Sequence, residues 1–166
     1  MKISPLEKDF IDIHSHLTDN EKNVFRILNT STIHFPSSPA DQPISVGLHP
    51  WHINDSAQEA FPGILTDSLK LPQVKAIGET GLDRLIKTNM EKQMEVFIIH
   101  IKLASEYNKP LIIHCVRAYS GLISLKNKFG TKVKWIIHGF NGNENTVEEL
   151  VSEGFYISLG LRLLRN

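Results

Sequence analysis

The sequence is short of the features that mark several large classes of protein. It has one cysteine, Cys115, so no internal disulfide can form and a reducing compartment, the cytoplasm, is expected. No apolar stretch approaches the ~20 residues that a membrane-spanning helix needs, and no apolar signal core follows the N-terminus. Lysine plus arginine and aspartate plus glutamate number 18 each, so net charge gives no electrostatic argument for a nucleic-acid or membrane partner.

What the chain does contain is typical of a globular domain with a sizeable core. Its 166 residues are 41% hydrophobic and 22% charged, a composition that excludes disordered, collagen-like and membrane-spanning chains. The length fits one domain. No linker, repeat or low-complexity tract divides the chain, although residues 35–42 have the prolines and serines of a loop. We therefore expect residues 1–166 to form a single domain.

Short apolar runs alternate with segments of helical period. The clearest helix is expected over residues 89–107, where Met90, Met94 and Phe97 begin an apolar repeat of three or four residues. Two shorter helices are expected around residues 119–123 and 147–151, and Leu71-Pro72 should end another helical segment. This alternation favours a parallel α/β sheet, either open or closed into a barrel. The runs of strand type are residues 10–13, 44–48, 74–77, 111–113, 135–137 and 155–159, with a weaker one at 24–28.

Residues of metal-ligand type follow the apolar runs. The carboxyl ends of parallel strands meet on one side of a sheet or barrel, so we expect these side chains to converge. His14 and His16 are two residues apart, which places both imidazoles on one face of a strand. Taken alone each histidine is a weak signal, since a single one is more often a hydrogen-bonded core residue. The residues are His14, His16, His49, Glu79, His114 and His138.

The donor set indicates a divalent cation held by imidazole and carboxylate. Such ligands suit zinc, manganese or iron, and the lack of thiolate ligands argues against a structural zinc knot. Cys115 adjoins His114 and should point to the opposite face of the strand. We expect His34 and His100 to be ordinary structural residues, and His52, directly after Trp51, is left open as a possible substrate contact.

These motifs, in this order, resemble the TatD-type metal-dependent deoxyribonuclease family, which belongs to the amidohydrolase-like TIM barrels. The resemblance covers nearly the whole chain and implies a parallel (β/α) barrel with strands one to seven present and the eighth missing. It also implies a metal-dependent hydrolase. The matching stretches are residues 12–16 (DIHSH), 47–50 (GLHP), 77–83 (IGETGLD), 110–118 (PLIIHCVRA), 137–142 (IHGFNG) and 156–160 (YISLG).

The resemblance also assigns roles to the predicted ligands. It implies that His14 and His16 hold one divalent metal, that His114 and His138 hold a second, and that Glu79 bridges the two as the catalytic carboxylate. Zinc, manganese, magnesium and iron are all left open. Two metals ~3.5–4 Å apart clamp the attacking and leaving oxygens of an in-line displacement at phosphorus.

The expected substrate is DNA or another phosphoester, with no membrane and no obligate protein partner. By the resemblance, His49 and Arg117 lie near the substrate phosphate. Two alternatives stay open: a dimetal hydrolase acting on another ester or an amide, and a degenerate barrel that binds metal without catalysis. Relatives that hydrolyse amides or lactones frequently carry a lysine at the bridging position, so Glu79 favours the nuclease reading.

One feature of the family is missing from the sequence. Its eighth strand carries a Glu-Thr-Asp segment whose aspartate completes the first metal site, whereas this chain stops at Asn166, just after the expected seventh strand. We therefore expect a metallohydrolase domain that is truncated at its C-terminus, with weaker metal binding at His14 and His16 and with doubtful activity of this chain alone.

Overall fold

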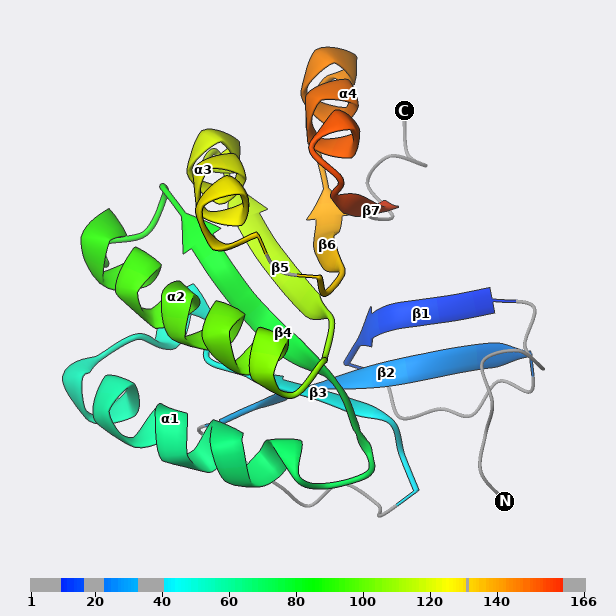
Figure 1. Cartoon of the computed structure of the whole chain (residues 1–166), viewed down its shortest axis with the longest axis vertical. Coiled ribbons are helices and arrows are strands. Elements are labelled where there is room, and N and C mark those ends of the chain that lie inside the picture. Colours follow the sequence, from blue (N-terminus) through cyan, green and yellow to red (C-terminus); the bar gives the residue numbers. More distant parts are fainter. Residues whose placement is uncertain (1–9, 17–22, 33–40, 131, 160–166) are drawn as a thin grey trace.

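Seven parallel strands form one sheet in the computed structural model, which describes residues 10–16, 23–32, 41–130 and 132–159. Each strand pairs with its neighbours in the sequence, so the order across the sheet is the order along the chain (Figure 1). The sheet curves into an incomplete barrel, and the predicted fold class is confirmed. The strands are β1 (Phe10–Ser15), β2 (Val24–Ser31), β3 (Ile44–Gly47), β4 (Val74–Asp83), β5 (Leu111–Val116), β6 (Trp135–Phe140) and β7 (Tyr156–Leu159).

Helices connect the strands from β3 onward, and three of the four α-helices begin at a side-chain cap. Asn54, Asn89 and Asn143 each precede a helix and accept a hydrogen bond from a backbone N–H in its first turn. No helix among the described residues has the length and apolar character needed to cross a membrane. The helices are the short 3-10 helix η2 (Pro50–His52) and the α-helices α1 (Asp55–Leu69), α2 (Met90–Glu106), α3 (Tyr119–Phe129) and α4 (Glu144–Ser152).

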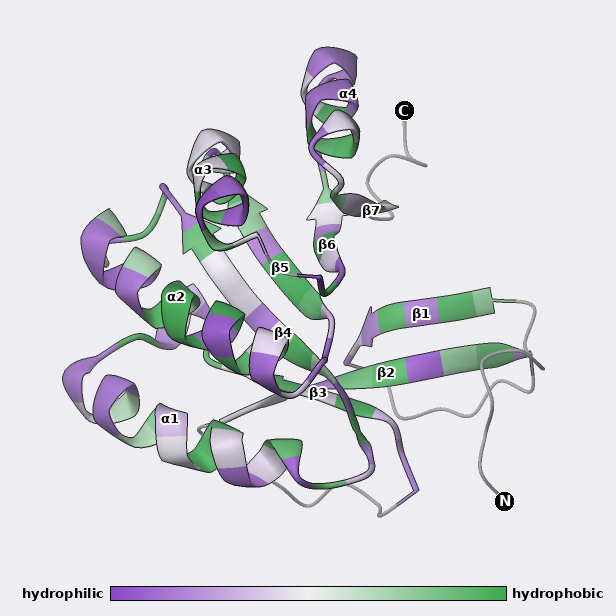
Figure 2. Ribbon diagram, in the orientation of Figure 1, coloured by the Kyte–Doolittle hydropathy of each residue, from purple (hydrophilic) through white to green (hydrophobic). Residues whose placement is uncertain are grey.

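The main core lies between the sheet and these helices. Figure 2 shows apolar colouring along the strands and on parts of each helix, with polar residues over the rest of the helices. Ile77, Leu111 and Ile113 of the central strands are fully buried, and so are Phe61 of α1 and Phe97 of α2. The central strands are therefore closely packed against the helices. A site built on these strands is supported by that packing on the helix-covered face of the sheet.

Five of the seven strands are longer than the apolar runs that predicted them, while β3 and β7 are each one residue shorter. β4 continues from the predicted residues 74–77 as far as Asp83, so Glu79 lies within the strand. Gly81 makes this possible: its φ is 143°, and a Cβ there would collide with the carbonyl oxygen of His114 on β5. The weak candidate at 24–28 is the full strand β2, while most of the predicted loop at 35–42 lies outside the described residues.

His100 links α2 to the end of β3. Its buried Nε2 accepts a hydrogen bond from the Leu48 N–H at 3.0 Å, and Nδ1 lies 2.8 Å from the Val96 carbonyl oxygen. The ring stacks on Phe61 with centroids 4.9 Å apart. The expectation that His100 is a structural residue fits these contacts. Burial lowers its pKa to about 4, so the imidazole stays neutral in the folded protein at pH 5 to 6.

Acid should therefore destabilise the fold partly through His100. Below its ordinary pKa of about 6.5 the unfolded chain binds a proton that the folded protein excludes, so the free energy of unfolding falls as pH drops towards 4. We expect H100Q to remove up to about 3 kcal/mol of this decline, measured by urea unfolding between pH 7 and pH 4. L150A, a core variant in α4, should lower the free energy of unfolding at every pH without changing how steeply that free energy falls between pH 7 and pH 4. Equal slopes for H100Q and the unmodified protein would contradict the assignment.

Candidate metal centre

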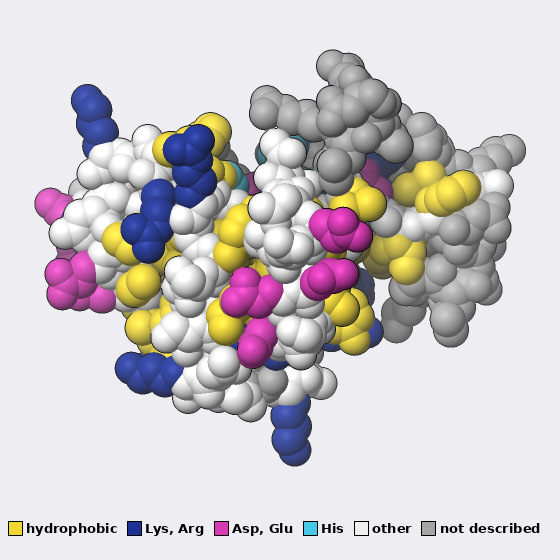
Figure 3. All heavy atoms as spheres, turned by 90° about the horizontal axis from the view of Figure 1, so that it is seen from above, with side chains coloured by type: hydrophobic (Ala, Val, Ile, Leu, Met, Phe, Trp, Pro, Cys, Tyr) yellow, Lys and Arg dark blue, Asp and Glu magenta, His cyan; other side chains and the backbone are white. Residues whose placement is uncertain are grey.

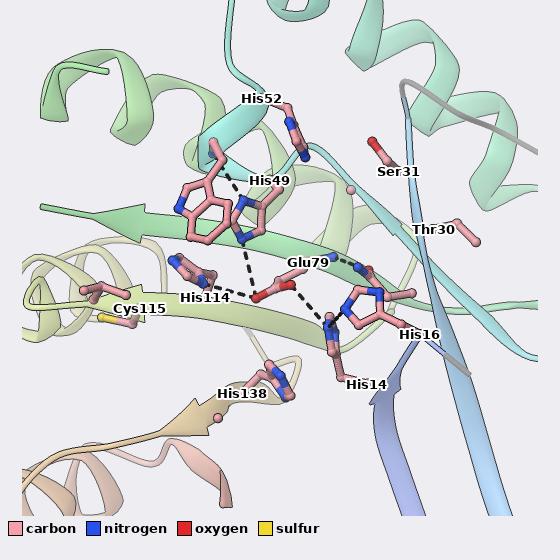
Figure 4. Close-up of a pocket in the computed structure, with 15 residues that line it drawn as sticks. His14, His16, Thr30, Ser31, His49, His52, Glu79, His114, Cys115 and His138 are labelled. Atoms are coloured by element: carbon pink, nitrogen blue, oxygen red, sulfur yellow. Dashed lines mark hydrogen bonds and ion pairs between the residues drawn. The ribbon is translucent and has the colours of Figure 1, made fainter. Parts of the chain in front are cut away.

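Five of the predicted ligands come from four different strands and face one pocket (Figure 4). Each belongs to a strand, or follows it closely, because parallel strands present their carboxyl ends to the same side of the sheet. The pocket has a volume of about 570 Å³, and His49, at the start of η2, also lines it. The structure therefore brings together His14 and His16 from the end of β1, Glu79 from β4, His114 from β5 and His138 from β6.

Glu79 is the centre of the cluster. Its Oε2 lies 3.3 Å from His14 Nε2, while its Oε1 lies 3.2 Å from His114 Nδ1 and 3.6 Å from His49 Nε2. The residue is 8% exposed, and burial alone would raise its pKa. Hydrogen bonds from His114 and His49 and the neighbouring His14 outweigh that effect and hold the pKa well below its usual range. Glu79 is thus an ionised carboxylate surrounded by three imidazoles.

The backbone of Glu79 is fixed by a residue that sequence reasoning missed. The Glu79 N–H donates to Asn29 Oδ1 on β2 at 3.0 Å, and the same oxygen accepts from Ser45 Oγ on β3 at 3.4 Å. Asn29 therefore ties three adjacent strands together directly behind the carboxylate. Asn29 directly follows the weak apolar run at 24–28, as the predicted ligands follow theirs, but an asparagine after such a run is usually a turn or cap residue.

His14 sits between the other imidazoles and the carboxylate. Its Nε2 lies 3.2 Å from His16 Nε2, and its ring lies against that of His138 with centroids 3.9 Å apart. Burial lowers the pKa of His14 to about 4, with His138 and His16 adding to the effect and Glu79 opposing it. Burial also lowers the pKa of His138. Both rings are therefore neutral near pH 7, the form in which imidazole binds a metal.

His114 is held from its far side by Asp83, a second residue that the sequence analysis left without a role. His114 Nε2 donates to Asp83 Oδ2 at 3.0 Å, and the indole Nε1 of Trp51 donates to the same oxygen at 2.8 Å. Asp83 is 2% exposed, and its Oδ1 accepts from the Leu85 N–H. Burial lowers the pKa of His114, but its bonds to Glu79 and Asp83 dominate and raise it. Nδ1 is thus the nitrogen that faces Glu79.

The cluster fits a divalent cation. His49, Glu79 and His114 each offer a ligand atom, and the three atoms lie within 4.8 Å of one another. His14 and His16 present two nitrogens to each other, an arrangement in which at most one can donate. Buried nitrogens without a hydrogen-bond partner within the described part of the chain are His14 Nδ1 and His138 Nδ1. A cation bound by imidazole and carboxylate would provide a partner for ring nitrogens that otherwise face one another.

The other predicted residues lie at different places. Arg117 is exposed just after β5, with a φ of 52°, and is not among the described residues that line the pocket, so its contact with phosphate stays a prediction. His52 lines the pocket and is exposed. Cys115 borders it too, with its sulfur directed away from Glu79, and burial raises its pKa to about 12 (Figure 4). His34 lies outside the described residues.

One face of the molecule mixes charges of both signs. In Figure 3, lysine and arginine side chains are scattered over the visible face, and acidic side chains gather near the centre of the view. Together with the zero net charge, this gives no sign of a continuous positive surface on the face shown.

Comparison with known proteins identifies a family. The model of the TatD related DNase family matches residues 37–165. An uncharacterized metal-dependent hydrolase of Buchnera aphidicola is 30% identical over 160 residues, covering 91% of this chain and 56% of that protein. The uncharacterized metal-dependent hydrolase YcfH of Escherichia coli K12 is 34% identical over 128 residues, covering 74% and 46%. The 3'-5' ssDNA/RNA exonuclease TatD of Escherichia fergusonii is 31% identical, covering 69% and 45%.

Solved structures agree in fold. A TatD homologue of Escherichia coli K12, YJJV, superposes with a TM-score of 0.73 at 22% identity, covering 89% of this chain and 66% of that one. A TatD family hydrolase of Entamoeba histolytica gives a TM-score of 0.72 at 23% identity, covering 92% and 65%. The chain spans about half the length of the curated relatives it matches. The family model matches most of this chain, and the chain therefore belongs to the TatD related DNase family.

Proposed function

We propose that this chain carries the metal site of a hydrolase that cleaves phosphodiester bonds in DNA. The observation that carries the proposal is the position of Glu79, a buried ionised carboxylate within 3.6 Å of imidazole nitrogens from three separate segments. Relatives named metal-dependent hydrolases and a 3'-5' ssDNA/RNA exonuclease support the same chemistry. The cytoplasm is the proposed compartment, on the evidence of a single cysteine.

Two divalent cations are proposed, with Glu79 between them. His14 and His16 would hold one, and His114 and His138 the other, while His49 adds a further imidazole beside the carboxylate. Bound cations of this kind lower the pKa of water and stabilise negative charge on a phosphoryl group. The proposal leaves the identity of the metals open among zinc, manganese, magnesium and iron.

The protein's own groups then do the positioning. Asn29 fixes the backbone of Glu79, and Asp83 fixes the ring of His114, so the ligand atoms are held in place before substrate arrives. Neutral His14 keeps a lone pair available at neutral pH because burial disfavours its protonated form. We propose that His49, whose Nε2 lies 3.6 Å from Glu79 Oε1, and Arg117 contact the phosphate.

The experiment is hydrolysis of single-stranded DNA by the full chain with manganese, magnesium or zinc. We expect cleavage that depends on added metal, is abolished by a chelator and returns when metal is restored. The same preparations are offered a lactone and a phosphomonoester. Cleavage of only these compounds would favour another dimetal hydrolase and overturn the DNA proposal.

A metal-binding barrel without catalysis is the second candidate, favoured by the chain spanning about half the length of its relatives. Calorimetric titration of metal together with the cleavage assay distinguishes the two. Binding of about two metals with no turnover of any substrate would support the non-catalytic site for this chain as it stands. Absence of metal binding would contradict both candidates.

A further inference from the structure

Trp51 places an exposed aromatic surface on the pocket. It lines the cavity and yet is 62% exposed, an unusual state for a large indole. The other strongly exposed aromatic residues of the described chain, Phe10 and Tyr156, are not among the residues that line the pocket. The position of Trp51 therefore calls for a reason other than the packing of a core.

Three contacts of the indole and one of its backbone hold Trp51 in place. Its Nε1 donates to the buried carboxylate of Asp83 at 2.8 Å, and its backbone N–H donates to His49 Nδ1 at 3.2 Å. The ring meets His49 and His114 edge to face, with centroids 5.1 and 5.9 Å apart. An exposed side chain normally samples several rotamers, whereas this one is held on both its polar edge and its backbone. The exposed part of the ring is thus a preformed flat surface.

His49 and His114 lie between that surface and Glu79, the proposed reaction centre. His49, which contacts Trp51, has its Nε2 3.6 Å from Glu79 Oε1, and His114, on the other side, is 3.2 Å from the same oxygen. A phosphodiester bound at Glu79 would bring the base of the adjoining nucleotide into this region. Flat aromatic side chains bind such bases by stacking, without preference for sequence.

We propose that Trp51 is the stacking platform for an unpaired nucleobase next to the scissile phosphodiester. The inference rests on the proposed function and narrows it, because a base stacked in a duplex does not offer its face to an indole. The substrate class is therefore a single strand or a frayed end. Asp83 serves this site as well, by holding the indole edge through the oxygen that also holds His114.

The test is binding of a thymidine hexamer with phosphorothioate linkages, which resist cleavage, in the presence of manganese. We expect W51A to weaken binding roughly 5- to 150-fold, the range for loss of one base–aromatic stack, and W51F to weaken it less. An abasic hexamer with the same backbone should bind W51A and the unmodified protein equally. Binding of the thymidine hexamer should also quench the fluorescence of exposed Trp51, since Trp135, the second of the two tryptophans, is fully buried.

The matched control is L85A, which removes another exposed apolar side chain, 64% exposed and outside the described lining of the pocket. It should bind both hexamers as the unmodified protein does. Equal binding of the thymidine hexamer by W51A and the unmodified protein would overturn the platform while leaving the proposed function in place. If the unmodified protein bound neither hexamer, the proposed function would fall together with the platform.

Discussion

E79Q should lose the proposed metal-dependent hydrolysis of DNA and most of the affinity for metal. Glutamine keeps the shape of the side chain but removes the negative charge that three imidazoles surround. A neutral amide cannot offset the repulsion between the two proposed cations, and its NH₂ group offers no lone pair to either. We expect the loss of metal affinity to exceed the roughly 10- to 100-fold that removal of an outer hydrogen-bond partner costs. Calorimetric titration and the rate of single-strand cleavage measure the two effects.

A surface carboxylate provides the matched control for E79Q. Asp67 is exposed on α1 and pairs with Lys70 at 2.8 Å, so D67N removes a charge of the same sign from a solvated position. Surface pairs of this kind contribute little, and D67N should bind metal and cleave DNA as the unmodified protein does. Far-UV circular dichroism should show that both variants fold. Retained metal affinity and cleavage in folded E79Q would remove Glu79 from the centre of the site.

Much of the site was predictable because a parallel sheet converts sequence order into spatial convergence. His14, Glu79, His114 and His138 each follow or end an apolar run, and adjacent parallel strands carry such residues to one edge. No contact between distant residues had to be known for that prediction. The strand order needed only the rule that sequential strands pair, together with the right-handed crossover.

The residues that the sequence did not reveal depend on register. Asn29 reaches the Glu79 backbone only because β2, β3 and β4 are aligned so that its side chain spans two strands. Asp83 reaches His114 only because β4 continues six residues beyond the predicted run at 74–77, with Gly81 accommodating close contact with β5. Apolar periodicity determines that a strand exists, but it does not determine where the strand ends or what faces it.

His49 shows a similar limit on assigning roles. The sequence places it after β3 and the resemblance assigns it to the phosphate, but its Nε2 lies 3.6 Å from Glu79, within the group whose ligand atoms could hold a cation. The turn of η2 explains this position, because His49 accepts the Trp51 N–H and is thereby directed into the pocket. A short 3-10 turn has no apolar period, so the sequence offered no means of orienting the ring.

Asp83 controls the metal-facing ring without touching Glu79. An imidazole that donates Nε2–H to a carboxylate presents the lone pair of Nδ1 to a metal, and the carboxylate raises the basicity of that lone pair. In this chain the acceptor is buried and ionised, because hydrogen bonds from Trp51 and His114 outweigh the effect of burial and lower its pKa. The His114 ring is therefore held between two carboxylates, with Asp83 Oδ2 at its Nε2 and Glu79 Oε1 at its Nδ1.

D83A should consequently weaken metal binding by roughly 10- to 100-fold, about 1.4 to 3 kcal/mol, although no ligand is removed. In the metal-free protein, the ¹⁵N shifts of the D83A His114 ring should move towards those of an Nδ1–H imidazole, because Glu79 Oε1 is then the remaining acceptor. D83N should restore part of the affinity, since its amide oxygen still accepts from His114 but carries no charge. Two groups donate to Asp83 Oδ2, the Trp51 indole and His114 Nε2, and W51F removes only the first of them. W51F should therefore leave the position of the His114 ring proton unchanged. The D83A variant could instead fold and bind metal as tightly as the unmodified protein. That result would show that Glu79 and the backbone of β5 hold the His114 ring without Asp83.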